Sequence, residues 1–122
     1  MSEVDVLEFL IGETPKAVYQ VDNDEMYFEL ENGKKYRFYH EQNCCESVSI
    51  EDIVGDLDDL VGAPILQAEE VTESGYDEEG WSESYTWTFY KFATIKGAVT
   101  VRWYGSSNGY YSESVYYEEV FE

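Results

Sequence analysis

Hydrophobic and polar residues alternate along most of this chain, which is the pattern of β-strands that bury one face. Many of the alternating residues are β-branched or aromatic, and these residues favour strands further. Asn32-Gly33 separates two such segments and predicts a tight hairpin turn between them. The predicted strands are residues 15–21, 26–31, 35–40, 46–53, 64–71, 84–95 and 98–105.

Two other segments place their apolar residues at helical spacing. Residues 3–11 do so immediately before Gly12, and residues 55–61 do so immediately before Gly62. A glycine directly after a periodic segment is a common helix stop, so each segment predicts a short helix. Together these elements predict an α+β fold, with a mostly antiparallel β-sheet and two short helices.

The predicted strand 84–95 has two contrasting faces. One face carries large rings throughout, whereas the other begins with two threonines and ends with two rings. We therefore expect the first face to lie on the core and only the far end of the second to be covered. The first face is Tyr85, Trp87 and Phe89, and the second is Thr86, Thr88, Tyr90 and Phe92. The preceding residues 71–82 are polar and contain glycine, which predicts a loop.

The chain has the length of one domain, residues 1–122, and its second half resembles its first. The segment LIGETP at 10–15 is echoed by LVGAP at 60–64, and RFYH at 37–40 by RWYG at 102–105. ESVSIEDI at 46–53 is then echoed by ESVYYEEV at 113–120. The interpretation is a duplicated helix-plus-meander unit over residues 3–53 and 56–120. The alternative is coincidence between strands rich in tyrosine.

The charge narrows the class of partner. Twenty-seven Asp and Glu against seven Lys and Arg give a formal net charge of −20, well above the magnitude of about 2–8 that keeps a small domain soluble. Proteins that bind nucleic acid or anionic membranes use basic surfaces, so neither ligand is expected. Basic proteins or cations are the natural partners, and the oligomeric state stays open, with a homo-oligomer as one alternative.

The negative charge is concentrated, because no Lys or Arg occurs between Glu41 and Tyr90. Carboxylates at alternate positions of a strand are about 6.6–6.8 Å apart, close to the phosphate spacing of DNA. This segment therefore predicts an acidic, DNA-mimic-like face that binds a partner, and the alternative is a solvated surface that serves solubility. The predicted face consists of Asp52, Asp56, Asp58, Asp59, Glu69, Glu70, Glu73, Asp77, Glu78 and Glu79.

Other chemistry has weaker support. His40, Cys44 and Cys45 form one cluster of soft ligands, but a structural zinc site usually draws ligands from two separate places. The favoured interpretation is a partly buried histidine beside thiols, because a bridge between adjacent cysteines closes a strained ring. The aspartates at 52–59 lack the order of an EF-hand. We therefore expect no bound metal or cofactor and no enzymatic activity.

A second candidate site lies near the end of the chain. An arginine, aromatic rings and an amide side chain surround flexible glycines there, as in a pocket for a small nucleotide-type ligand. The alternative is a hairpin with its turn at Asn108-Gly109. The residues of this candidate ligand loop are Arg102, Trp103, Tyr104, Asn108 and Tyr110.

The segments at residues 40–65 and 85–115 resemble a family of small acidic proteins of phages and prophages, catalogued as a domain of unknown function. The resemblance implies an accessory phage protein that acts in the host cytoplasm, often against host machinery or defence. The leading hypothesis is an inhibitor that binds a basic, nucleic-acid-handling host protein through the acidic face. The alternatives are a protein that sequesters a small nucleotide-type signal and a virion or scaffolding component.

Overall fold

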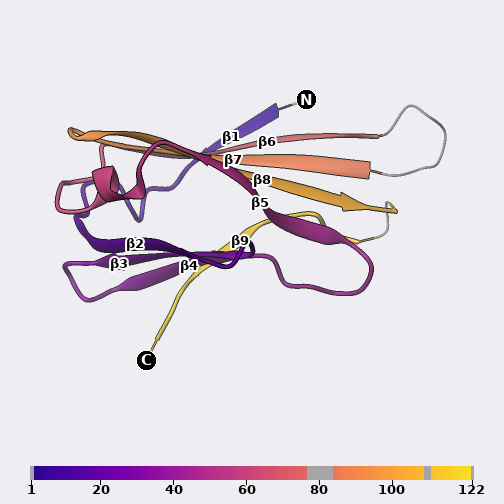
Figure 1. Ribbon diagram of the computed structural model, residues 1–122, viewed down its shortest axis with the longest axis horizontal. Coiled ribbons are helices and arrows are strands. Elements are labelled where there is room, and N and C mark those ends of the chain that lie inside the picture. Colours follow the sequence, from indigo (N-terminus) through magenta and orange to yellow (C-terminus); the bar gives the residue numbers. More distant parts are fainter. Residues whose placement is uncertain (1, 77–83, 109–110, 122) are drawn as a thin grey trace.

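The chain folds into two antiparallel β-sheets that face each other, as the computed structural model shows for residues 2–76, 84–108 and 111–121 (Figure 1). The five-stranded sheet has the order β1 (Ser2–Val6), β6 (Gln67–Tyr76), β7 (Ser84–Thr94), β8 (Gly97–Ser107) and β5 (Ser47–Val54). The four-stranded sheet has the order β2 (Pro15–Val21), β3 (Glu25–Leu30), β4 (Lys35–Tyr39) and β9 (Tyr116–Glu119).

The predicted α+β class is wrong, because the described residues contain no α-helix and only one 3₁₀ turn, η1 (Leu57–Leu60). The segment 3–11 begins as strand β1 and then turns. The backbone N–H of Leu7 still donates to Ala68 O at 2.9 Å, so pairing with β6 continues past the end of the strand. Leu7 and Leu10 are buried by this turn, and the apolar spacing that suggested a helix follows from it. No helix in the described part of the chain is long and apolar enough to cross a membrane.

The core lies between the two sheets and is rich in rings. Phe28 and Phe38 from the four-stranded sheet meet Tyr90 and Phe92 of β7, with ring centroids 4.9 Å apart for Phe28–Phe92 and for Phe38–Tyr90. The assignment of the Tyr85, Trp87 and Phe89 face to the core is therefore wrong, whereas the expectation that Tyr90 and Phe92 are covered is confirmed. Thr88, Tyr90 and Phe92 face inward and are almost fully buried. The rings of Tyr85, Trp87 and Phe89 are on the outer face, and they are half-buried only.

Strand β6 is longer than the sequence suggested, because it continues to Tyr76. Residues 71–76, predicted as loop, pair with β7 in unbroken register, with Thr72 opposite Thr88 and Ser74 opposite Thr86. The rest of the predicted loop, residues 77–82, lies outside the described residues. The inner face of β6 and β7 is thus apolar at one end and lined by hydroxyl groups at the other.

The two halves of the chain are arranged in the same way. Each forms a three-stranded meander, β2–β3–β4 or β6–β7–β8, and the next strand of each half crosses to pair with the meander of the other half. Arg37 of β4 consequently pairs with Glu118 of β9, while Arg102 of β8 pairs with Glu51 of β5. Such an exchange is expected of a duplicated unit, although the duplication itself stays a prediction.

Candidate functional site

A polar cleft opens on the inner face of the five-stranded sheet, at the end where hydroxyl groups replace the core rings. It has a volume of about 320 Å³ and is bounded by strands β1, β6 and β7 and by the segment that leads into β9. This segment crosses the sheet because the chain must pass from β8 in one layer to β9 in the other. The lining residues are Asp5, Glu70, Thr72, Ser74, Thr86, Thr88, Ser114 and Val115.

Glu70 connects this cleft to the core. The phenol of Tyr90, which is fully buried, donates a hydrogen bond of 2.5 Å to Glu70 Oε2. Burial of the carboxyl raises the pKa of Glu70, and the negative charge of Asp5 raises it further, while the Tyr90 hydrogen bond acts in the opposite direction. A carboxylate with a raised pKa is one that gains from a cation placed beside it.

The same two carboxylates influence the neighbouring phenols. The pKa of Tyr117 on β9 is raised, first by burial and then by the charges of Glu70 and Asp5. The pKa of Tyr90 is raised strongly by its burial and by Glu70. The mouth of the cleft is therefore a region of negative potential between two tyrosines that stay protonated at neutral pH.

A third carboxylate continues the polar surface along β7. Glu113 is buried and accepts hydrogen bonds from Ser84 Oγ at 2.5 Å, from Ser107 Oγ at 2.6 Å and from Thr86 Oγ1 at 2.8 Å. It lines a second pocket of about 320 Å³, which shares Ser74 and Thr86 with the cleft. The cleft and this pocket adjoin at Ser74 and Thr86 and are together called the groove, and Tyr76 and Tyr85 also line the pocket.

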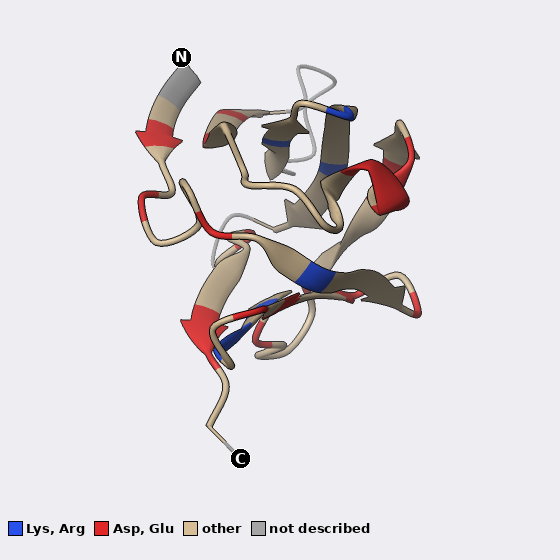
Figure 2. Ribbon diagram, turned by 90° about the vertical axis from the view of Figure 1, so that its left-hand side faces the viewer, with Lys and Arg blue, Asp and Glu red and all other residues tan. Residues whose placement is uncertain are grey.

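None of the residues described as lining this groove is Lys, Arg or His. Both arginines and Lys96 have partners elsewhere. Arg37 contacts Glu118, Arg102 contacts Glu51, and Lys96 Nζ donates to Val61 O at 2.8 Å. Figure 2 shows the few basic positions scattered over the strands and turns, while acidic positions occur in most elements. The groove is thus an acidic site without an internal counter-ion among the described residues.

The structure distributes the described residues of the predicted acidic face over four places. Glu69 and Glu73 point to the outer side of the five-stranded sheet, whereas Glu70 points inward to the cleft. Asp56, Asp58 and Asp59 lie at η1, at the opposite end of the molecule from the point where β6 ends (Figure 1). Asp52 lies on β5, 3.7 Å from Arg102. Asp77, Glu78 and Glu79 lie outside the described residues.

The candidate ligand loop is mostly strand. Trp103 lies in β8 with its side chain in the core, and Arg102 and Tyr104 point to the outer face. They meet Trp87 there: its ring centroid is 4.5 Å from that of Tyr104 and 5.5 Å from the guanidinium carbon of Arg102. Asn108 follows the end of β8, and Tyr110 lies outside the described residues. Sequence reasoning missed Trp87, because it assigned this ring to the core.

His40 belongs to a polar network around Glu46. Its Nε2 is 2.8 Å from Glu46 Oε2 and its Nδ1 is 2.7 Å from Ser114 O, so both ring nitrogens face acceptors. Glu46 also accepts the backbone N–H groups of Asn43 and Cys44, each at 2.9 Å. These backbone hydrogen bonds, that of Cys44 foremost, and His40 lower the pKa of Glu46 to about 2.

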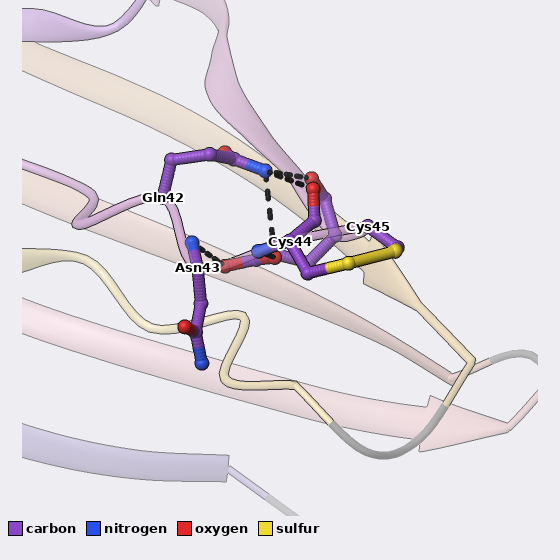
Figure 3. The surroundings of a disulfide bond; sticks show 5 residues. Gln42, Asn43, Cys44 and Cys45 are labelled. Atoms are coloured by element: carbon purple, nitrogen blue, oxygen red, sulfur yellow. Dashed lines mark hydrogen bonds between the residues drawn. A yellow bond between two sulfur atoms is a disulfide. The ribbon is translucent and has the colours of Figure 1, made fainter.

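The prediction of free thiols is wrong, since Cys44 and Cys45 are joined by a disulfide bond (Figure 3). The loop wraps around the Glu46 carboxylate, and this leaves both cysteines exposed instead of packed in the core. Across the described residues, no group of three or more His, Cys, Asp and Glu side chains is placed to hold a metal ion. The cluster is therefore a structural anchor for the turn before β5.

Sequence reasoning included Glu70 in the site but missed Asp5 and the hydroxyl groups. A signal for them was present, because the threonines at 86 and 88 share a face with Tyr90 and Phe92. A strand face that changes from rings to hydroxyls indicates a core that opens into a polar cavity. Asp5 could not be found in this way, since its place depends on the pairing of β1 with β6.

Fold and site together define an acidic antiparallel β-sandwich with a cleft on the inner face of its five-stranded sheet. Residues 8–117 match the model of the DUF7448 family, a domain of unknown function, and the chain belongs to this family. No curated protein and no solved structure matches the chain.

Proposed function

We propose that this protein binds a basic partner protein and that the cleft at Asp5 and Glu70 receives a cationic side chain of that partner. The observation that carries the proposal is the cleft itself, with two carboxylates, several hydroxyl acceptors and no cation among its described lining residues. Burial disfavours the charged form of Glu70 and so raises its pKa. A lysine or arginine in the cleft stabilises that charge and offsets the cost of its burial. It also finds hydroxyl oxygens for its remaining N–H groups.

The rest of the surface supports the same class of partner. With a net charge of −20, the long-range field attracts basic proteins and repels nucleic acid and anionic membranes. The arginines contribute little to that field, because glutamates of the chain already hold them. Acidic groups outside the cleft then attract the partner at long range, while Asp5 and Glu70 bind its cationic side chain.

The biological setting follows from the resemblance to small acidic phage and prophage proteins. In that setting the partner is a nucleic-acid-handling or defence protein of the host, and the complex forms in the host cytoplasm and inhibits it. The carboxylates of the predicted DNA-mimic-like face that lie at η1 and on the outer face of β6 are away from the cleft and add to the long-range attraction only.

The test is capture of basic proteins from a bacterial host lysate, with quantitative mass spectrometry of the captured proteins. The bait is the wild-type chain, and the comparison is the double variant Asp5→Asn/Glu70→Gln. The matched control is Asp56→Asn/Asp58→Asn, which removes the same charge at η1. Enrichment of one nucleic-acid-binding protein that the cleft variant loses and the control keeps supports the proposal. Equal capture by all three baits contradicts it.

A second candidate function has its own observation. Trp87, Tyr104 and Arg102 form a half-buried aromatic and cationic platform on the outer face of the five-stranded sheet. Such a platform stacks planar rings and suits a nucleotide-type ligand. Thermal stabilisation by nucleotides that is lost in Trp87→Ala favours this function, whereas the same stabilisation in Trp87→Ala and wild type excludes the platform.

A further inference from the structure

Strand β1 forms one edge of the five-stranded sheet, and among the described strands it pairs only with β6. Figure 2 shows this strand, next to the N mark, at the margin of the molecule. The N–H of Leu7 donates to Ala68 O, and hydrogen-bonded positions alternate along an antiparallel strand. Asp5 therefore bonds to β6 as well, whereas the backbone N–H and C=O groups of Val4 and Val6 point away from the sheet.

The edges formed by the other described strands are protected against further pairing. Strand β2 begins at Pro15 and has a register shift directly after it, and β5 has a register shift at Glu51. Strand β9 has four residues. Proline, bulges and short length are features that keep natural edge strands from pairing with other chains. Strand β1 has neither a proline nor a register shift, and its charged residues are acidic, so it is the edge best suited to an added basic strand.

The side chains of β1 alternate between the outer face of the sheet and the cleft. Val4 and Val6 are each 58% exposed on the outer face, where Val4 continues a row formed by Val71 and Phe89. Asp5 lies between the two valines and lines the cleft. A strand added beside β1 has the same alternation. Its residues opposite the valines extend the apolar row, and its residue opposite Asp5 lies beside that carboxylate.

Charge decides which kind of chain fits this edge. Two copies of the protein repel each other, because each has a net charge of −20. Pairing of two β1 strands about Asp5 would also place the two Asp5 carboxylates opposite each other, and like charges at such positions are destabilising. A basic segment places a cation there instead. Its backbone also bonds to the groups of Val4 and Val6, which have no backbone partner among the described residues.

We infer that the partner supplies an extended segment that pairs with β1 as an added strand, with a lysine or arginine opposite Asp5 and an apolar residue on either side of it. The inference rests on the proposed function for the basic character of the partner, and it adds the way in which that partner reaches the cleft. Main-chain hydrogen bonds give the segment its affinity, and the alternation of apolar and basic residues gives it specificity.

The test compares peptides that differ only in which backbone nitrogens are methylated. A capped peptide of alternating valine and lysine is made without methylation, with two valines N-methylated and with two lysines N-methylated. In the paired strand the valines lie opposite Val4 and Val6 and direct their N–H groups to β1, whereas the lysine N–H groups point to solvent. In ¹H–¹⁵N NMR titrations at low salt, valine methylation should weaken binding at least about tenfold, and lysine methylation should leave it unchanged.

The backbone of β1 gives a second readout. The amides of Val4 and Val6 should exchange rapidly with solvent in the unbound protein and slowly in the presence of the unmethylated peptide. Val4→Pro removes one outward N–H group and keeps the pairing with β6, so it should weaken binding at least about tenfold. The matched control is Val4→Ala, which keeps the N–H group and should weaken binding less.

The outcomes separate this inference from the proposed function. Equal binding of the three peptides, with no added protection of the Val4 and Val6 amides, overturns the edge pairing, while the proposed function stands if Asp5→Asn/Glu70→Gln weakens that binding. Failure of the unmethylated peptide to bind also overturns the edge pairing, and the capture experiment then decides on the proposed function by itself. If Val4→Pro does not fold, the methylated peptides still give the answer on wild-type protein.

Discussion

Glu70 accepts a hydrogen bond of 2.5 Å from Tyr90, and this contact ties the carboxylate of the cleft to the centre of the core. Tyr90 is fully buried and packs on Phe38, so the position of its phenol is fixed. The carboxylate that we assign to partner binding is therefore held by a rigid support. Sites on such supports keep their geometry before the ligand arrives.

Glu70→Gln should make the unbound protein more stable at neutral pH. The folded-state pKa of Glu70 is raised above the unfolded value, so its charge opposes folding once the pH exceeds about that unfolded value. Glutamine keeps an oxygen that accepts from Tyr90 and removes the charge. Thermal unfolding should be followed from about pH 3 to about pH 8, which covers both forms of the carboxyl group. The stability of the variant relative to wild type should increase as the pH rises. Glu73→Gln, on the outer face of the same strand, is the control, and an equal gain there contradicts the account.

Glu46 should have the opposite pH dependence. Its folded-state pKa of about 2 lies below its unfolded value of 4.5, so its contribution to stability is present above pH 4.5 and is lost as the pH falls towards 2. Denaturant unfolding at a series of acidic pH values should show a steeper loss of stability in wild type than in Glu46→Gln. The same dependence of stability on pH in the two proteins would contradict the role assigned to the Glu46 network.

The assignment of the β7 faces makes a prediction about stability. Phe92→Ala should lower the free energy of unfolding by about 3–5 kcal/mol, because it leaves a cavity in the ring cluster of the core. Trp87→Ala should cost clearly less, since that ring is on the outer face and only half-buried. Urea unfolding of both variants compares them directly. A larger loss for Trp87→Ala would restore the orientation that the sequence suggested.

The disulfide can be checked by mass. Intact-protein mass spectrometry of protein purified without reductant should show that Cys44 and Cys45 lack the two thiol hydrogens. Iodoacetamide should label both residues only after reduction, because both are exposed. Labelling of both cysteines without reductant would show that the bond does not form in solution.

Strands β2 to β8 could be predicted from the sequence, whereas β1, which was predicted as a helix, β9 and the core face of β7 could not. Residues 15–21 form β2 with the predicted bounds, and Asn32-Gly33 does form the turn between β3 and β4, with Gly33 at a φ of 92°. The segment 3–11 was wrongly predicted as a helix, because a turn after a strand buries Leu7 and Leu10 and gives them the same spacing as a helical face. Local periodicity does not distinguish the two.

The candidate site was predicted only in part for a related reason. Glu70 was identified from charge, but charge does not tell which side of β6 a carboxylate is on, and a shift of one residue exchanges the faces. Asp5 and Glu113 reach the groove through pairings and crossings between segments far apart in the chain. Those depend on the topology of the two sheets, which the pattern of a single segment does not contain.

The central claim is that the cleft binds cationic side chains, and the most direct measurement is the affinity of a lysine-containing peptide with a Ser/Gly background for wild type and for Asp5→Asn/Glu70→Gln. The account predicts at least about tenfold weaker binding by the double variant and an affinity for wild type that falls as salt rises. Equal affinity of the two proteins, or an affinity that does not depend on salt, would contradict it.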